Sequence, residues 1–124
     1  MTPQPKPPRR GPKPRKALRR STVRIARQSA KRGQVIKADR AWSSFVRKRA
    51  LGMCECCGGM GSDAHHIYGR KAHPALRFAP INGIYLCRLC HNEWHAAPIS
   101  RRSWFAVMYP ASWSMLQTFV RDSR

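Results

Sequence analysis

The stretch CRLCHNEWH, residues 87–95, carries two cysteines and two histidines within a single short segment. Its cysteines are separated by two residues, the spacing at which one turn of chain presents two thiolates to the same metal ion. His91 and His95 are four positions apart, so on a helix they share one face and can bind one ion together. The stretch therefore holds ligands for one metal site or for two, and the rest of the sequence has to decide.

A second cysteine pair with the same spacing lies upstream. Cys54 and Cys57 form the first pair and Cys87 and Cys90 the second, an arrangement typical of a tetrahedral structural zinc. The chain has five cysteines, so a pure disulfide framework would leave one unpaired. We assign the fifth, Cys56, as a free thiol, with an exchange of Cys56 for Cys57 as the alternative. The cysteines of the opening stretch are thus explained without its histidines.

Four of the five histidines are candidates for a second metal site: the adjacent pair His65 and His66 and the helix pair His91 and His95. Three imidazoles on one ion leave positions open for water and substrate, which is typical of a catalytic metal site. The remaining histidine of the adjacent pair can then act as a general base, because its unperturbed pKa lies near neutral pH. His73, beside a proline and basic residues, is interpreted as a surface or loop histidine.

The chain is short and strongly basic. It has 124 residues, with 25 Lys and Arg against 5 Asp and Glu, and a formal net charge of +20. A core of this size is marginal without a metal or disulfides, and so basic a protein usually binds nucleic acid. A basic nucleic-acid binder without chemistry is the alternative at this level. No apolar run approaches the roughly 18 residues of a membrane span, and no signal peptide is evident, so we expect a cytoplasmic protein.

The composition changes near residue 38. Residues 1–37 are rich in Lys, Arg and Pro, and we expect a largely disordered, basic, nucleic-acid-binding arm with a broken helix that Gly33 interrupts. Residues 38–124 are expected to form one small α+β domain. Its expected elements are a helix over 38–50, strands over 63–69 and 82–87, a helix over 88–96 and two C-terminal helices within 100–121.

Two segments together resemble a known nuclease motif. DAHHIYGR at 63–70 and NGIYLCRLCHNEWH at 82–95, inside the two cysteine pairs, resemble the HNH endonuclease motif, or ββα-metal finger, over roughly residues 53–97. A narrower resemblance, which includes the aromatic helix that follows, is to phage recombination endonucleases of the NinG or Rap kind. The resemblance implies a ββα-metal finger with a four-cysteine structural zinc, flanked by helices.

The HNH resemblance also implies a role for each matching residue. His65, His91 and His95 would bind one catalytic divalent cation, Mg²⁺ or a transition metal. His66 would be the general base, and Asn82 would hold the hairpin so that His66 points at the scissile phosphate. Adjacent residues on a flat strand point to opposite faces, so the two neighbouring histidines can serve one site only if the strand bends or ends there.

The expected function is therefore metal-dependent endonuclease hydrolysis of DNA phosphodiester bonds, in phage or prophage recombination or DNA processing. Arg70, Lys71 and Arg77 are candidates for binding DNA phosphates, with plain solvated charges as the alternative. Two other functions stay open: a non-catalytic zinc-ribbon nucleic-acid-binding protein, and an accessory HNH protein of a phage packaging complex. The expected partners are DNA, branched DNA included, and phage or host recombination or packaging proteins.

Overall fold

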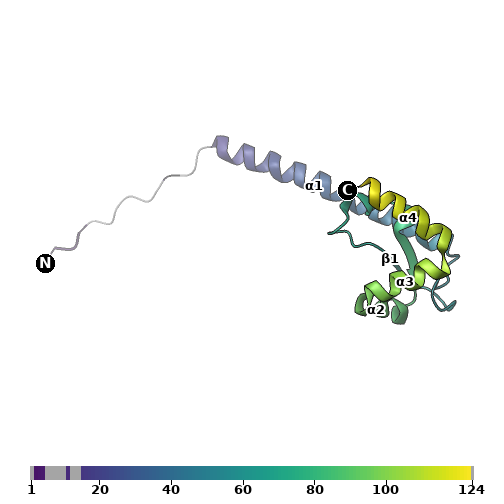
Figure 1. The fold of residues 1–124 in the computed structure, drawn as a ribbon. Helices are drawn as coiled ribbons and strands as arrows, with labels where there is room; N and C mark the ends of the chain where they lie inside the picture. Colours follow the sequence, from purple (N-terminus) through teal and green to yellow (C-terminus); the bar gives the residue numbers. More distant parts are fainter. Residues whose placement is uncertain (1, 5–10, 12–14, 124) are drawn as a thin grey trace. The chain divides into compact units, whose positions relative to one another are not determined.

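The computed structural model describes residues 2–4, 11 and 15–123, and it divides into two compact units, residues 1–34 and 35–124. The elements in chain order are α1 (Arg15–Arg49), β1 (Asp63–His66), the 3-10 helices η1 (Pro74–Leu76) and η2 (Pro80–Asn82), β2 (Gly83–Leu86), α2 (Arg88–Ala96), α3 (Pro98–Met108) and α4 (Pro110–Asp122) (Figure 1). The expected small α+β class is confirmed. None of the described helices is long and apolar enough to cross a membrane.

Helix α1 is longer than the sequence pattern predicted. It continues through Gly33 and through the expected domain start at residue 38, so the predicted break and the predicted helix start are both wrong. A glycine inside a helix costs only about 1 kcal/mol relative to alanine, and the surrounding Arg, Lys, Gln and Ala residues favour a helix. Most of the predicted arm before Arg15 lies outside the described residues. The division between the two units falls after Gln34.

Strands β1 and β2 form one antiparallel hairpin, paired from Asp63 with Leu86 to His66 with Gly83. Both strands are shorter than predicted, because the chain between them folds into a loop that contains η1 and η2. Helix α2 follows β2 directly and spans the predicted residues. Cys87 caps its N-terminus, where the Cys87 sulfur accepts a hydrogen bond from the backbone N–H of Cys90. The hairpin and the helix together place the histidine-bearing segments side by side.

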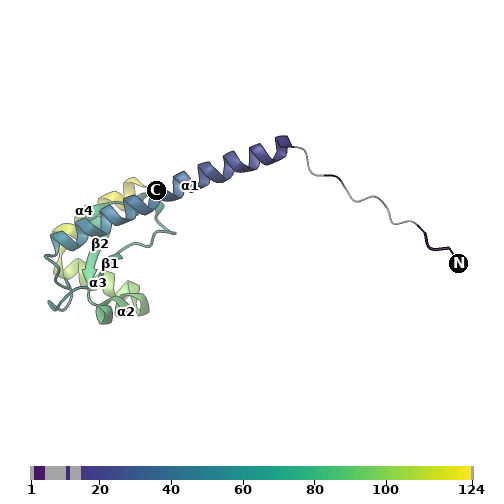
Figure 2. The same ribbon diagram turned by 180° about the vertical axis from the view of Figure 1, so that it is seen from behind.

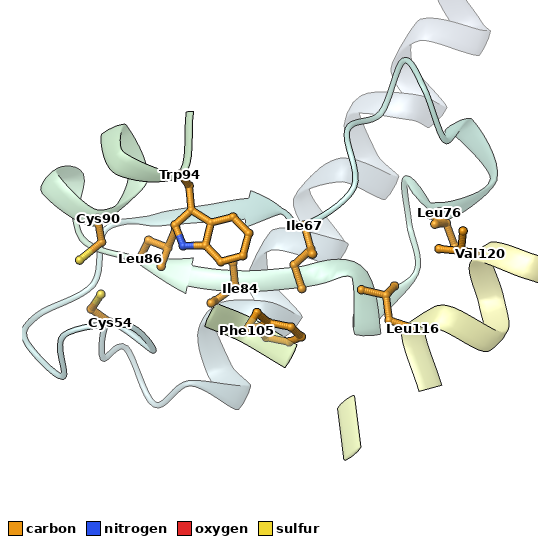
Figure 3. Close-up of a cluster of buried hydrophobic side chains, with 10 residues drawn as sticks. All are labelled: Cys54, Ile67, Leu76, Ile84, Leu86, Cys90, Trp94, Phe105, Leu116 and Val120. Atoms are coloured by element: carbon orange, nitrogen blue, oxygen red, sulfur yellow. The ribbon is translucent and has the colours of Figure 1, made fainter. Parts of the chain in front are cut away.

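The two faces of the hairpin are covered by different helices. Ile84 and Leu86 point to one face and pack with Trp94 of α2, Phe105 of α3 and Leu116 of α4 (Figure 3). On the other face Tyr85 packs with Trp42 and Val46 of α1, and the C-terminal end of α1 lies beside the hairpin in Figure 2. Every residue of β2 is therefore buried.

Gly83 permits the close approach of α1 to the hairpin. A Cβ atom at this position would lie 2.4 Å from Cγ2 of Val46 and 2.9 Å from Cζ2 of Trp42. The indole Nε1 of Trp42 also donates a hydrogen bond to the carbonyl oxygen of Ala79 at 2.9 Å. Because Trp42 and Val46 are both buried, this part of α1 is held firmly against the loop and strand that precede α2.

Candidate active site

The structure brings four cysteines together. The sulfur atoms of Cys54, Cys57, Cys87 and Cys90 all lie within 4.8 Å of one another. Those of Cys57 and Cys87 are 3.8 Å apart, which matches the separation of about 3.8 Å between two thiolates bound to a tetrahedral zinc at about 2.3 Å. In both pairs the backbone N–H of the second cysteine points at the first sulfur, at 3.5 Å. These residues fit a metal ion such as zinc.

The fifth cysteine is not part of this cluster. Cys56 is half-buried, and its sulfur lies 4.0 Å from a guanidinium nitrogen of Arg101. The structure therefore places Cys57, not Cys56, with the other three. Burial raises the pKa of Cys90. Burial acts on Cys54 in the same sense, but hydrogen bonds from backbone groups lower the pKa of Cys54 to about 6. A thiolate, the form that binds metal, is thus accessible near neutral pH.

Three histidines form a second cluster. The ring nitrogens of His65, at the end of β1, and of His91 and His95, on α2, also lie within 4.8 Å of one another. The Nε2 atoms of His91 and His95 are 3.0 Å apart, and the ring of His65 is 4.9 Å from each of theirs between centroids. Three convergent imidazoles are a donor set for zinc or another transition metal. The predicted ligand set is therefore assembled in one place.

The environment of His65 keeps its imidazole neutral. Burial and the nearby His91 and His95 lower the pKa of His65 to about 4. The neutral ring is the form that offers a lone pair to a metal ion. The predicted surface histidine, His73, lies apart from the cluster, with its ring edge against Tyr68.

Asp63 orients one of the three candidate ligands. Its Oδ2 accepts a hydrogen bond from Nδ1 of His91 at 2.9 Å, which leaves Nε2 of His91 free to face the cluster. That hydrogen bond lowers the pKa of Asp63, and Arg88, 3.5 Å away, acts in the same direction. Sequence reasoning missed this residue. The available signal was an acidic residue two positions before His65 in a chain with only 5 Asp and Glu.

His66 lies on the opposite face of β1 from His65. Its ring stacks on Trp42, with centroids 3.8 Å apart and planes within 3°. Nε2 of His66 is 2.8 Å from the carbonyl oxygen of Arg77. Because a carbonyl only accepts, Nε2 carries the proton and Nδ1 is left with a free lone pair. Burial lowers the pKa of His66, so the ring is held in the neutral form.

Both neighbouring histidines nevertheless open into one cavity of about 520 Å³. The strand ends at His66, so the two faces of β1 meet the cavity at the strand's end. The cavity lining includes all four histidines, His65, His66, His91 and His95, with Arg70 and the α1 residues Asp39, Arg40, Trp42 and Ser43. Because the strand ends at His66, the adjacent residues His65 and His66 can both reach this one cavity.

Asn82 fixes the loop that follows His66. Its side chain is fully buried. Its Oδ1 accepts from the backbone N–H of Tyr68 at 2.8 Å, and its Nδ2 donates to the carbonyls of Tyr68 and Leu76 at 3.0 and 3.1 Å. These contacts tie both ends of the loop together. Asn82 itself has no contact with the histidine cluster among these hydrogen bonds, and its role in aiming His66 at a phosphate stays a prediction.

The three basic residues predicted to bind DNA occupy different environments. Arg70 lines the cavity and Lys71 is exposed. The guanidinium of Arg77 instead donates two hydrogen bonds to Asp39, at 3.0 and 2.7 Å, and its carbonyl accepts from His66. Arg77 is thereby engaged within the protein. Its backbone carbonyl positions His66, and the predicted phosphate contact of its side chain stays a prediction.

Comparisons of the chain with protein-family models, with curated proteins and with solved structures gave no match. The assignment of the site therefore depends on the residues themselves and on their geometry.

Proposed function

We propose that the chain is a metal-dependent endonuclease of the HNH type that hydrolyses DNA phosphodiester bonds, in phage or prophage recombination or DNA processing. One observation carries the proposal. A single cavity contains a three-histidine ligand set and a fourth, neutral imidazole outside that set. Three protein ligands leave coordination positions open, as in catalytic metal sites, whereas four cysteines close a structural one. The three-histidine cluster thus fits a catalytic metal site, and the four-cysteine cluster fits a structural one.

The residues of the cavity would share the chemistry as follows. A divalent ion held by His65, His91 and His95 would supply positive charge to the phosphoryl oxygen and to the leaving 3′ oxygen. Nδ1 of His66 would accept the proton of the attacking water, since Nε2 is committed to the Arg77 carbonyl. Trp42 and the Arg77 carbonyl would keep that ring in one orientation. The expected products are a 5′-phosphate and a 3′-hydroxyl.

The charge of the chain supports a nucleic-acid substrate. The formal net charge is +20, and such a protein attracts polyanions over long distances. A non-catalytic zinc-ribbon DNA binder would share this charge and the cysteine cluster, but it would have no need for the three-histidine set or for Asp63 behind it. An accessory protein of a packaging complex would share the whole site, and only its partners would differ.

The test is cleavage of defined DNA by purified, zinc-loaded protein. Linear, nicked and four-way-junction DNA are incubated with and without Mg²⁺, Mn²⁺ or Co²⁺, and the product ends are analysed. We expect metal-dependent cleavage, with the junction cut faster than linear DNA if the role is in recombination. His73→Ala, outside the cluster, is the matched control and should cleave normally. DNA binding without cleavage under every condition would favour the zinc-ribbon function instead.

A further inference from the structure

One face of α1 lies beside the histidine cluster and carries polar and basic side chains. Arg40, Ser43, Ser44 and Arg47 recur at the i, i+3, i+4 and i+7 spacing that places residues on one side of a helix. All four line a second cavity, of about 500 Å³, together with Asp63 and other residues of the hairpin. We call these four residues the α1 row.

The second cavity adjoins the first. Both are lined by Arg40, Ser43, Ala64 and His91. His91, a candidate metal ligand, therefore lies where the two cavities meet, with Arg70 on the lining of the first and Arg47 on that of the second. We call the two adjoining cavities together the groove, and its lining includes the histidine cluster.

The arginines of the row lack carboxylate partners within the described part of the chain. Four of the 5 acidic residues are already paired with other arginines. Those pairs are Arg49 with Glu55, Arg77 with Asp39, Arg88 with Asp63, and Arg101 with Glu93. The fifth acidic residue, Asp122, lies at the end of α4. Arg40 and Arg47 therefore bring uncompensated positive charge to the groove, which favours an anion there.

The row is held in place by the other side of the same helix. Trp42 and Val46 are buried against the hairpin, and the guanidinium of Arg49 donates to the carbonyls of Pro80 and Gly83 at 2.9 and 2.6 Å. The position of the row relative to the histidines is thus fixed by packing. Lys48 is also exposed on this helix but lines neither cavity. It therefore has the same charge as Arg40 and Arg47 but a different position.

We propose that the α1 row binds more than one phosphate of a DNA strand that runs along this groove past the histidine cluster. This inference rests on the proposed function for its substrate. Seven residues of helix span about 10.5 Å, whereas one nucleotide step rises about 3.4 Å along the axis of a duplex, so the span covers more than one step. Arg40 and Arg47 can therefore reach different phosphates. The hydroxyl of Ser44 is a neutral donor of the kind that also contacts phosphates, whereas that of Ser43 donates to the carbonyl of Arg40 at 3.2 Å.

The experiment measures DNA binding as a function of salt, without added divalent metal, for the full chain and for Arg40→Gln, Arg47→Gln and Lys48→Gln. Removal of one arginine–phosphate pair should reduce the slope of log K against log salt by about 0.9 on duplex DNA. We expect this reduction for each arginine variant and a wild-type slope for Lys48→Gln. Replacing single phosphates by neutral methylphosphonates then maps the phosphates that the protein binds. The position that weakens wild-type binding should have no effect in the matching arginine variant.

The outcomes separate this inference from the proposed function. Arginine variants that behave like Lys48→Gln, with unchanged methylphosphonate patterns, overturn the inference even if the wild type cleaves DNA. Reduced slopes and a shifted pattern support it even if the wild type cleaves nothing, in which case the proposed function alone fails. A wild-type protein that binds no DNA overturns both. Far-ultraviolet circular dichroism of each variant verifies that it is folded.

Discussion

The orientation and the metal affinity of each imidazole that faces the proposed catalytic ion depend on what its second ring nitrogen contacts. For His91 that contact is the carboxylate of Asp63, at 2.9 Å. Such a partner fixes the ring orientation and increases the basicity of the ligand nitrogen, and its loss typically costs 10- to 100-fold in metal affinity. Asp63 thus contributes to the site without facing the ion.

Asp63→Asn should therefore weaken binding of the catalytic ion by about 10- to 100-fold. Titration with Mn²⁺ or Co²⁺, followed by calorimetry or by cleavage rate, measures this change. Asp122→Asn removes the same charge from an exposed position on the last helix and is the control. Equal metal affinity in Asp63→Asn and wild type would show that the carboxylate does not support the ligand.

Sequence spacing predicted each cysteine pair and the pair His91 and His95 because the geometry within each pair is local, whereas the choice of His65 as third ligand came from the HNH resemblance. Two cysteines separated by two residues, or two histidines four apart on a helix, converge whatever the rest of the chain does. The partners of these residues could not be predicted in this way. Asp63 and His91 are 28 positions apart, and the Asp39–Arg77 pair that restrains the loop spans 38 positions. Such contacts exist only once α2 and α1 have packed on the hairpin and its loop.

The shape of the groove depends on the contact between α1 and β2. Gly83→Ala would place a Cβ atom 2.4 Å from Cγ2 of Val46, so the helix has to move. Overpacking of this kind costs about 1–3 kcal/mol. We expect the free energy of unfolding, measured by urea denaturation, to fall by that amount.

Gly33→Ala is the contrasting variant. A Cβ atom at Gly33 meets nothing within 4 Å, and alanine stabilises a helix interior by roughly 0.5–1 kcal/mol relative to glycine. This variant should therefore match or exceed wild-type stability. Wild-type stability in Gly83→Ala would mean that the helix does not need its close approach to the strand.

Element ends were the hardest feature to predict. The expected break in α1 overestimated the effect of one glycine, whose cost is small beside the propensity of its neighbours. The strands end earlier than their apolar pattern suggested because Asn82 draws Tyr68 and Leu76 into a loop. Helix α2 was predicted correctly, since a capping cysteine and a proline after its end limit it on both sides.

The unit formed by residues 35–124 has little to hold it together besides its core and its cysteine cluster. Its sheet consists of two strands of four residues each. Domains this small commonly need a metal or disulfides, and none of the five cysteines forms a disulfide. Cys54 and Cys90 belong to the buried core (Figure 3), so a metal ion there would join the loop before β1 to the start of α2.

Removal of that metal should consequently unfold the unit, because binding energy at such a site is folding energy. Chelation, or the substitution Cys90→Ser, should abolish the cooperative thermal transition followed by circular dichroism. His95→Ala, which affects only the histidine cluster, should keep the transition. An unchanged transition in chelated protein, or absence of tightly held zinc from native protein by elemental analysis, would contradict a structural metal.

The central claim is that His66 acts as the base and the other three histidines of the cavity bind the metal. It is tested most directly by DNA cleavage in a metal titration of His66→Ala and His91→Ala. We predict that both variants lose cleavage, His66→Ala by about 100-fold or more, the usual scale for acid–base catalysis. Raising the metal concentration should partly restore His91→Ala and leave His66→Ala inactive. Full activity in His66→Ala would contradict its role as the base, and its rescue by metal would mean that His65 and His66 have exchanged roles.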